Sequence, residues 1–192
     1  MTEILSILTQ FVIFLLLFSI PFTPINLTKL LNLKKGNLNF IDAHVTNIIF
    51  FSYLSLIFSF LNINLQILFN TYLLIAFFMV LINLTKFNFK NINFYLCLVF
   101  ILVVLSIFFS LAQNLKIEWD GHHWIEKVLV FYNGESVENL INVLLPSYPH
   151  LGSYIWAFFW KNSLMELEYF GRYFHVYFYI SSIYLVLNII NL

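Results

Sequence analysis

The chain has 192 residues, of which 61% are hydrophobic, 20% aromatic and 9% charged, and its formal net charge is zero. The neutral balance gives no indication of a nucleic-acid or acidic partner, and the single cysteine, Cys97, excludes an intrachain disulfide. A water-soluble fold of this length would leave large apolar patches exposed. The composition therefore predicts an integral membrane protein.

Four long apolar runs occupy most of residues 1–112. A helix needs about 20 mostly apolar residues to cross the hydrocarbon core of a bilayer. We therefore expect four transmembrane helices in this first region, at residues 4–20, 43–61, 65–84 and 94–112. Only residues 62–64 separate the second run from the third, which predicts a tight helical hairpin.

Residues 113–150 form a polar segment in an otherwise apolar chain. Five of the nine acidic residues and three of the five histidines lie in it. Because titratable groups carry proton transfer and ligand binding, this segment is the expected functional region. Its apolar periodicity predicts two amphipathic helices at the membrane surface, over about residues 121–132 and after Ser136. The apolar face of the second consists of Val137, Leu140, Ile141, Leu144 and Leu145.

Residues 151–192 are expected to hold two further transmembrane helices, at 151–160 and 173–192, so that the fold is an all-α bundle of about six spans. The loops after spans one, three and five carry lysine or arginine and are expected to face the cytoplasm. Residues 113–150 then form an external loop, periplasmic or extracellular, of a bacterial plasma membrane protein. The last run has no polar tail, and we expect the chain to be the N-terminal part of a longer protein.

Three polar residues of the first expected surface helix, Asp120, His123 and Lys127, recur at the spacing of one helix face. A carboxylate beside an imidazole and an ammonium is suited to act as a general base or to bind a cation. An aspartate before a glycine at a helix start is equally suited to be an N-cap. Likewise, Lys127 is suited either to bind a phosphate or to extend its charge to the membrane surface.

The remaining candidates also have a functional and a structural interpretation. Trp124 is either a ligand-stacking ring or an interfacial aromatic residue, and Arg172 is either a ligand or an anchor at the start of the last span. His122 and His123 are adjacent and point to different faces, so they do not form one site. No His/Cys spacing typical of a metal site occurs, and we predict no metal ligands.

A longer pattern runs from Trp119 to about Tyr179. Its members are the Trp119-Asp120 pair, His123, Trp124, Lys127, the Tyr148-Pro149-His150-Leu151 turn and Arg172. This order resembles the polytopic GT-C glycosyltransferases, in particular the protein mannosyltransferase and lipid A aminoarabinose transferase-like group. Members of that group have an early acidic residue in the first large external loop, then surface helices, a Pro-Pro-Leu-like turn and an arginine-bearing segment.

The resemblance implies inverting transfer of a sugar from a polyprenyl-phosphate donor to a cell-envelope lipid, glycan or protein on the non-cytoplasmic face. It makes Asp120 the general base. It assigns substrate binding to six residues: His123, Trp124, Lys127, Tyr148, His150 and Arg172. The resemblance leaves open whether a divalent cation assists. The bilayer is an implied partner and nucleic acid is not.

The chain departs from the pattern of this group at two positions. Gly121 stands where many members have a second acid, and His150 replaces the second proline of the turn. We expect the 192-residue piece alone to be inactive, because the later membrane half of the group is absent. Two alternatives stay open: an O-antigen polymerase or ligase, and a non-enzymatic transporter or membrane assembly subunit. A transporter is expected to carry charged groups within its spans, and spans one, three and four carry none.

Overall fold

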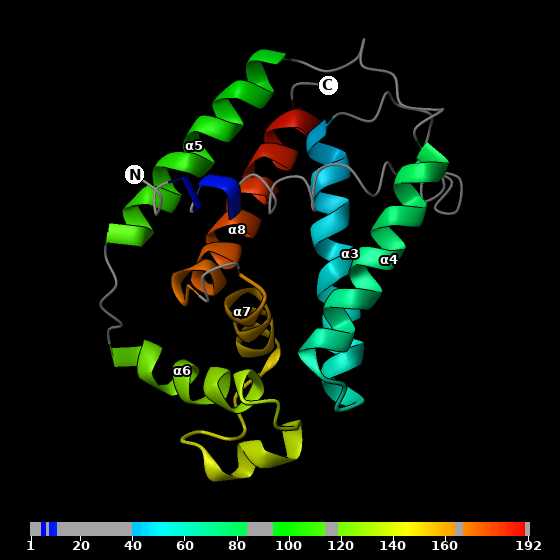
Figure 1. Cartoon of the computed structure of the whole chain (residues 1–192). Helices are drawn as coiled ribbons and strands as arrows, with labels where there is room; N and C mark the ends of the chain where they lie inside the picture. Colours follow the sequence, from blue (N-terminus) through cyan, green and yellow to red (C-terminus); the bar gives the residue numbers. More distant parts are fainter. Residues whose placement is uncertain are drawn as a thin grey trace. The chain divides into compact units, whose positions relative to one another are not determined.

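The computed structural model describes residues 5–6, 8–10, 40–83, 94–113, 119–163 and 167–190. From residue 40 onward these ranges contain helices and no strands (Figure 1). The elements are α3 (Phe40–Phe60), α4 (Leu65–Asn83), α5 (Phe94–Gln113), α6 (Trp119–Tyr132), the 3-10 helix η2 (Val137–Asn142), α7 (Leu151–Lys161) and α8 (Tyr169–Ile190). Five of them begin and end close to apolar runs found in the sequence. The first expected span, at residues 4–20, lies largely outside the described residues.

The predicted multi-pass membrane bundle is wrong for the part of the chain that the structure describes. Among these residues, no helix combines the length and the apolar character needed to cross a membrane. A crossing takes about 20 mostly apolar residues, whereas α6 has 14 residues and α7 has 11. Polar residues are also buried inside α3, at Asn47, Ser55 and Ser59. The absence of a membrane-crossing helix overturns the expected spans that fall on the described residues. It also overturns the expected location of residues 113–150 on the outer side of a bacterial plasma membrane.

The chain divides into two compact units. The first consists of Met1–Phe50, Tyr72–Leu105 and Phe178–Leu192, and the second of Phe51–Thr71 and Ser106–Tyr177. All of the candidate site residues belong to the second unit. The contacts described below are therefore contacts within that unit.

Helix α7 forms the core of the second unit. Seven consecutive residues of α7, from Ser153 to Phe159, are buried, so this helix is covered on all sides. The Phe51 ring lies 4.9 Å from the Phe158 ring, and the rings of Phe159 and Phe174 stack at 4.9 Å. Aromatic pairs at such distances stabilise a core beyond the area they bury. They pack the second half of α7 against Phe51 of α3 and Phe174 of α8.

Helix α6 packs against α7 (Figure 1). The Ser153 hydroxyl donates a hydrogen bond to the Trp124 carbonyl at 3.3 Å. The Tyr132 and Trp160 rings lie 4.5 Å apart at the other end of the contact. Gly134 follows α6 with a φ of 83°, a left-handed conformation that glycine adopts without steric cost. The helix predicted over about residues 121–132 is thus present as α6, and it packs against α7.

The second predicted surface helix is wrong in both length and type. Residues after Ser136 form the six-residue 3-10 helix η2, and Leu140 is its one buried residue. Val143 is extended, with φ of −98° and ψ of 163°, which ends the helix before its expected last turn. Pro146 lacks an N–H group and disfavours helical backbone in the residue before it, so the helix does not resume.

Candidate functional site

Helix α6 carries four of the residues that the sequence marks as candidates. It begins at Trp119, so Asp120 lies in its first turn, followed by His123, Trp124 and Lys127. The side chain of Asp120 lies outside the described part of the structure. On the helix backbone, Asp120 and Lys127 are two turns apart on one face, roughly 10 Å along the axis.

The ammonium of Lys127 is the centre of the site. Its side chain is only 1% exposed. The Nζ atom donates a hydrogen bond to the Tyr148 carbonyl at 2.8 Å. It lies 5.8 Å from the centre of the Trp124 ring and 5.8 Å from the centre of the Tyr148 ring. Aromatic faces attract cations at this distance, so two rings and one carbonyl hold the charge.

Lys127 has no acidic partner among the described side chains. No ion pair or hydrogen bond joins it to a carboxylate there. Burial lowers the pKa of the Lys127 ammonium, because a cation loses its hydration in the interior. An ammonium has three donors, and one of them is used by Tyr148. The buried charge and the two remaining donors make this atom suited to an anionic ligand.

His150 adjoins Lys127 and joins the site to α3. Its carbonyl accepts the Tyr154 amide at 2.9 Å, which starts α7. Its Nε2 atom lies 3.2 Å from the Ser59 hydroxyl, which itself donates to the Leu56 carbonyl at 2.8 Å. Because the hydroxyl proton is committed to that carbonyl, Nε2 is the donor to the Ser59 oxygen. Burial first, and the charge of Lys127 second, lower the pKa of His150.

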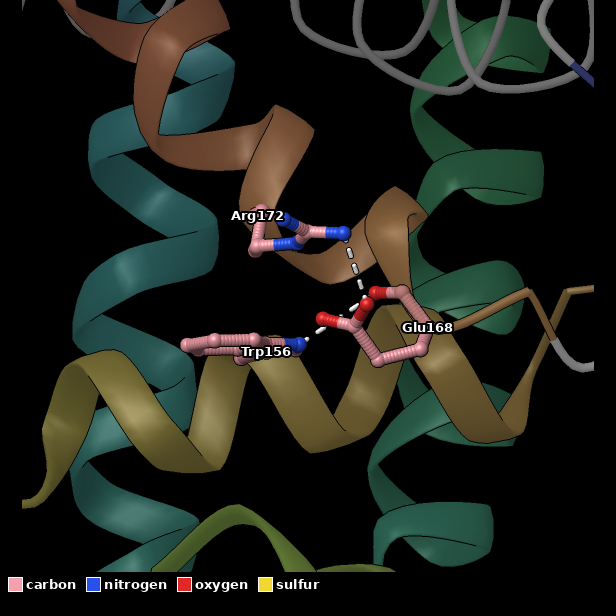
Figure 2. Close-up of polar contacts among 3 residues, drawn as sticks. All are labelled: Trp156, Glu168 and Arg172. Carbon is pink, nitrogen blue, oxygen red and sulfur yellow. Dashed lines mark hydrogen bonds and ion pairs between the residues drawn. The ribbon is translucent and has the colours of Figure 1, made fainter. Parts of the chain in front are cut away.

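Arg172, in contrast, has its charge neutralised locally. Its Nη2 atom forms an ion pair with Glu168 Oε2 at 2.8 Å, one helical turn earlier (Figure 2). The Trp156 indole donates to the Glu168 carbonyl at 3.2 Å. Burial raises the pKa of Glu168, and Arg172 opposes part of that rise. The ion pair and the Trp156 hydrogen bond therefore link α7 to the start of α8.

The structure brings together four of the predicted site residues: Trp124, Lys127, Tyr148 and His150. His123 is half-buried, and no described hydrogen bond joins it to these four. Two further residues near this group are not predicted from the sequence: Ser59 of α3, whose hydroxyl contacts His150, and Glu126 of α6, whose carboxylate accepts the backbone amide of Leu144. Ser59 and His150 are 91 residues apart, so no local pattern indicates their pairing. Comparison with protein-family models, curated proteins and solved structures gives no match.

Proposed function

We propose that the chain is a glycosyltransferase whose sugar donor has a phosphate leaving group, and that Lys127 binds this phosphate. The observation that supports it is the buried ammonium of Lys127 without a described carboxylate partner. A phosphate provides a negative charge that no described side chain supplies to Lys127, and it accepts hydrogen bonds from the two N–H donors for which the described residues offer no acceptor. Charge-assisted hydrogen bonds of this kind are stronger than neutral ones.

Of the two cations that the sequence suggests for the phosphate, the geometry favours Lys127 over Arg172. The guanidinium of Arg172 is already paired with Glu168 at 2.8 Å. A phosphate at that position would have to compete with the Glu168 carboxylate, which is already paired with the guanidinium. Among the described residues, the hydrogen-bond partner with which the ligand competes at Lys127 is the neutral carbonyl of Tyr148.

The aromatic residues around Lys127 suit the sugar part of such a donor. Ligand sites typically combine aromatic walls with a few polar groups that fix the orientation. The centres of the Trp124 and Tyr148 rings lie 6.2 Å apart, and each lies 5.8 Å from the ammonium. Tyr148 is 51% exposed, so one face of the pair is within reach of a ligand.

In the proposed reaction, the Asp120 carboxylate takes the proton of an acceptor hydroxyl. The hydroxyl oxygen then forms a bond to the anomeric carbon of the sugar. The bond from that carbon to the phosphate oxygen breaks at the same time, and the phosphate leaves with the electron pair. The ammonium of Lys127 stabilises the negative charge that develops on this oxygen. A single displacement of this kind inverts the configuration at the anomeric carbon.

The first test is the binding of inorganic pyrophosphate to the purified protein by titration calorimetry. Lys127→Met keeps the length of the side chain and removes its charge, and we expect it to weaken binding at least tenfold. Lys161→Met is the matched control, because the Lys161 ammonium also donates to a carbonyl and lies over a tyrosine ring. Equal affinity in the wild type and Lys127→Met would refute the assignment.

The second test concerns Asp120 and first asks, against the expectation of an inactive 192-residue piece, whether the chain transfers sugar from a water-soluble prenyl-phosphate sugar, with products followed by mass spectrometry. If it does, Asp120 can be tested as the base. Loss of a general base typically slows a reaction about 10²- to 10⁴-fold. We therefore expect Asp120→Asn to reduce transfer by that factor while pyrophosphate affinity stays close to that of the wild type. Unchanged transfer in Asp120→Asn would rule out this carboxylate as the base.

A further inference from the structure

We propose that residues 143–150, which we name the strap, gate access to Lys127. In the structure the Tyr148 carbonyl occupies the position on the Lys127 ammonium that a phosphate oxygen takes when the donor binds. The strap is thus an intramolecular substitute for the ligand. The identity of that ligand rests on the proposed function, whereas the opening of the strap does not.

Two neighbouring residues of α6 hold the strap closed. Glu126 Oε2 accepts the backbone N–H of Leu144 at 3.0 Å, near the start of the strap. Lys127 Nζ donates to the Tyr148 carbonyl at 2.8 Å, near its end. Between these contacts the chain is loosely packed, and residues 144–149 are all exposed. Segments with little buried apolar surface open at low free-energy cost.

The strap also contains a strained residue. Leu145 has a φ of 55°, in the left-handed region that side chains with a Cβ atom disfavour. It precedes Pro146, and the Leu145 carbonyl accepts the Tyr148 amide at 3.1 Å to close a tight turn. Such backbone conformations persist only where neighbouring contacts enforce them, and they gather at ligand clamps and switches. Strain in the closed strap lowers the cost of opening it.

Opening of the strap is coupled to ligand binding, because the Lys127 ammonium exchanges the Tyr148 carbonyl for the ligand. When the strap opens, the Lys127 ammonium loses the Tyr148 carbonyl, the acceptor that the described residues give it. A buried cation without a hydrogen-bond partner is unfavourable, so the open strap is poorly populated without a ligand. A phosphate that replaces the carbonyl restores the contact and adds negative charge. Binding therefore shifts the population from the closed to the open strap.

The ligand-free test treats the intact, folded chain with an acetylating N-hydroxysuccinimide ester. The rate at which Lys127 reacts is measured by mass spectrometry of the peptides after digestion. A buried lysine reacts only when the strap opens. Glu126→Ala removes the acceptor for Leu144, and the loss of one such hydrogen bond predicts about fivefold faster acetylation of Lys127. Glu126→Gln keeps an acceptor oxygen while removing the charge, so its rate should stay near that of the wild type. Lys161 in the same molecules is the internal standard.

The second measurement adds pyrophosphate. We expect it to slow the acetylation of Lys127 and to bind up to about fivefold more tightly to Glu126→Ala than to Glu126→Gln. If Glu126→Ala does not fold, Glu126→Asp keeps the charge and shortens the reach, and the same direction of change is expected. An unchanged acetylation rate overturns the gate even if pyrophosphate binds. Faster acetylation without protection by pyrophosphate supports the gate and counts against the proposed phosphate site.

Discussion

At the scale of single residues, two helical glycines of the second unit differ in the space around them. A Cβ atom on Gly171 would lie 2.0 Å from Trp156 Cδ1 and 2.4 Å from the Trp156 carbonyl oxygen. A Cβ atom on Gly152 would lie 3.5 Å from the nearest atom, Cε1 of His175, which is an ordinary contact. Gly171 is therefore required by the close approach of α8 to α7, and Gly152 is not.

This difference predicts opposite effects of the same substitution. Gly171→Ala forces α8 away from α7 and is expected to lower the free energy of unfolding by about 2–3 kcal/mol. Gly152→Ala gains helix propensity worth up to about 1 kcal/mol and is expected to be neutral or stabilising. Urea unfolding followed by circular dichroism measures both. Similar destabilisation by the two substitutions would contradict the packing of α8 on Trp156.

At the scale of elements, the end of α6 depends on a residue from α7. The last carbonyls of a helix lack partners within it. The Lys161 ammonium donates to the carbonyl of Tyr132, the last residue of α6, at 2.6 Å, and it lies 5.6 Å from the centre of the Tyr132 ring. A cation at this end of a helix also interacts favourably with its dipole.

Lys161→Met is accordingly expected to loosen the last turn of α6. The loss of one charge-assisted hydrogen bond from a half-buried site predicts a decrease of about 1–2 kcal/mol in the free energy of unfolding. Hydrogen–deuterium exchange should become faster over residues 129–132 and stay unchanged over the buried middle of α7. Lys161→Arg keeps a cation within reach and should preserve most of the protection. Unaltered exchange in Lys161→Met would show that Tyr132 does not need this cap.

At the scale of the whole molecule, stability near neutral pH depends on groups with opposed pKa shifts. The pKa of His150 is lowered from its ordinary value of 6.5, so the unfolded chain binds a proton before the folded chain does. Stability from this group is lost as the pH falls below about 6.5 and through the lower pKa of the folded state. The pKa of Glu168 is raised from 4.5, so this group has the opposite effect and favours the folded state as the pH falls.

Replacing His150 should therefore change how stability responds to acid. Between pH 7.5 and 5.5 the free energy of unfolding of the wild type is expected to fall, and that of His150→Gln is expected to fall less steeply. The glutamine retains a hydrogen-bonding group near Ser59 and does not titrate. Denaturant midpoints measured at four pH values in this range test the expectation. Parallel pH profiles for the two proteins would mean that His150 is not held neutral by Lys127 and burial.

Some helix positions could be predicted from the sequence, whereas the length of η2 and the environment of the helices could not. The turn at residues 62–64 and the register of α6 follow from local patterns, because helix formation depends on neighbours a few residues apart. The length of η2 was mispredicted, because periodicity in five apolar residues does not reveal the extended Val143 and the left-handed Leu145 that interrupt it. The membrane assignment was also wrong, because overall composition ignores where polar residues such as Asn47 are buried.

What the sequence by itself determined is the local framework: helices along the apolar runs, and the α6 register that puts Asp120, His123 and Lys127 on one face. Only the tertiary structure decided which cation is available. Arg172 meets Glu168 one turn away, whereas Lys127 is buried against the carbonyl of Tyr148, 21 residues further along the chain. The reason is physical: periodicity records contacts within a helix, but the burial of a charge depends on which distant segments pack over it.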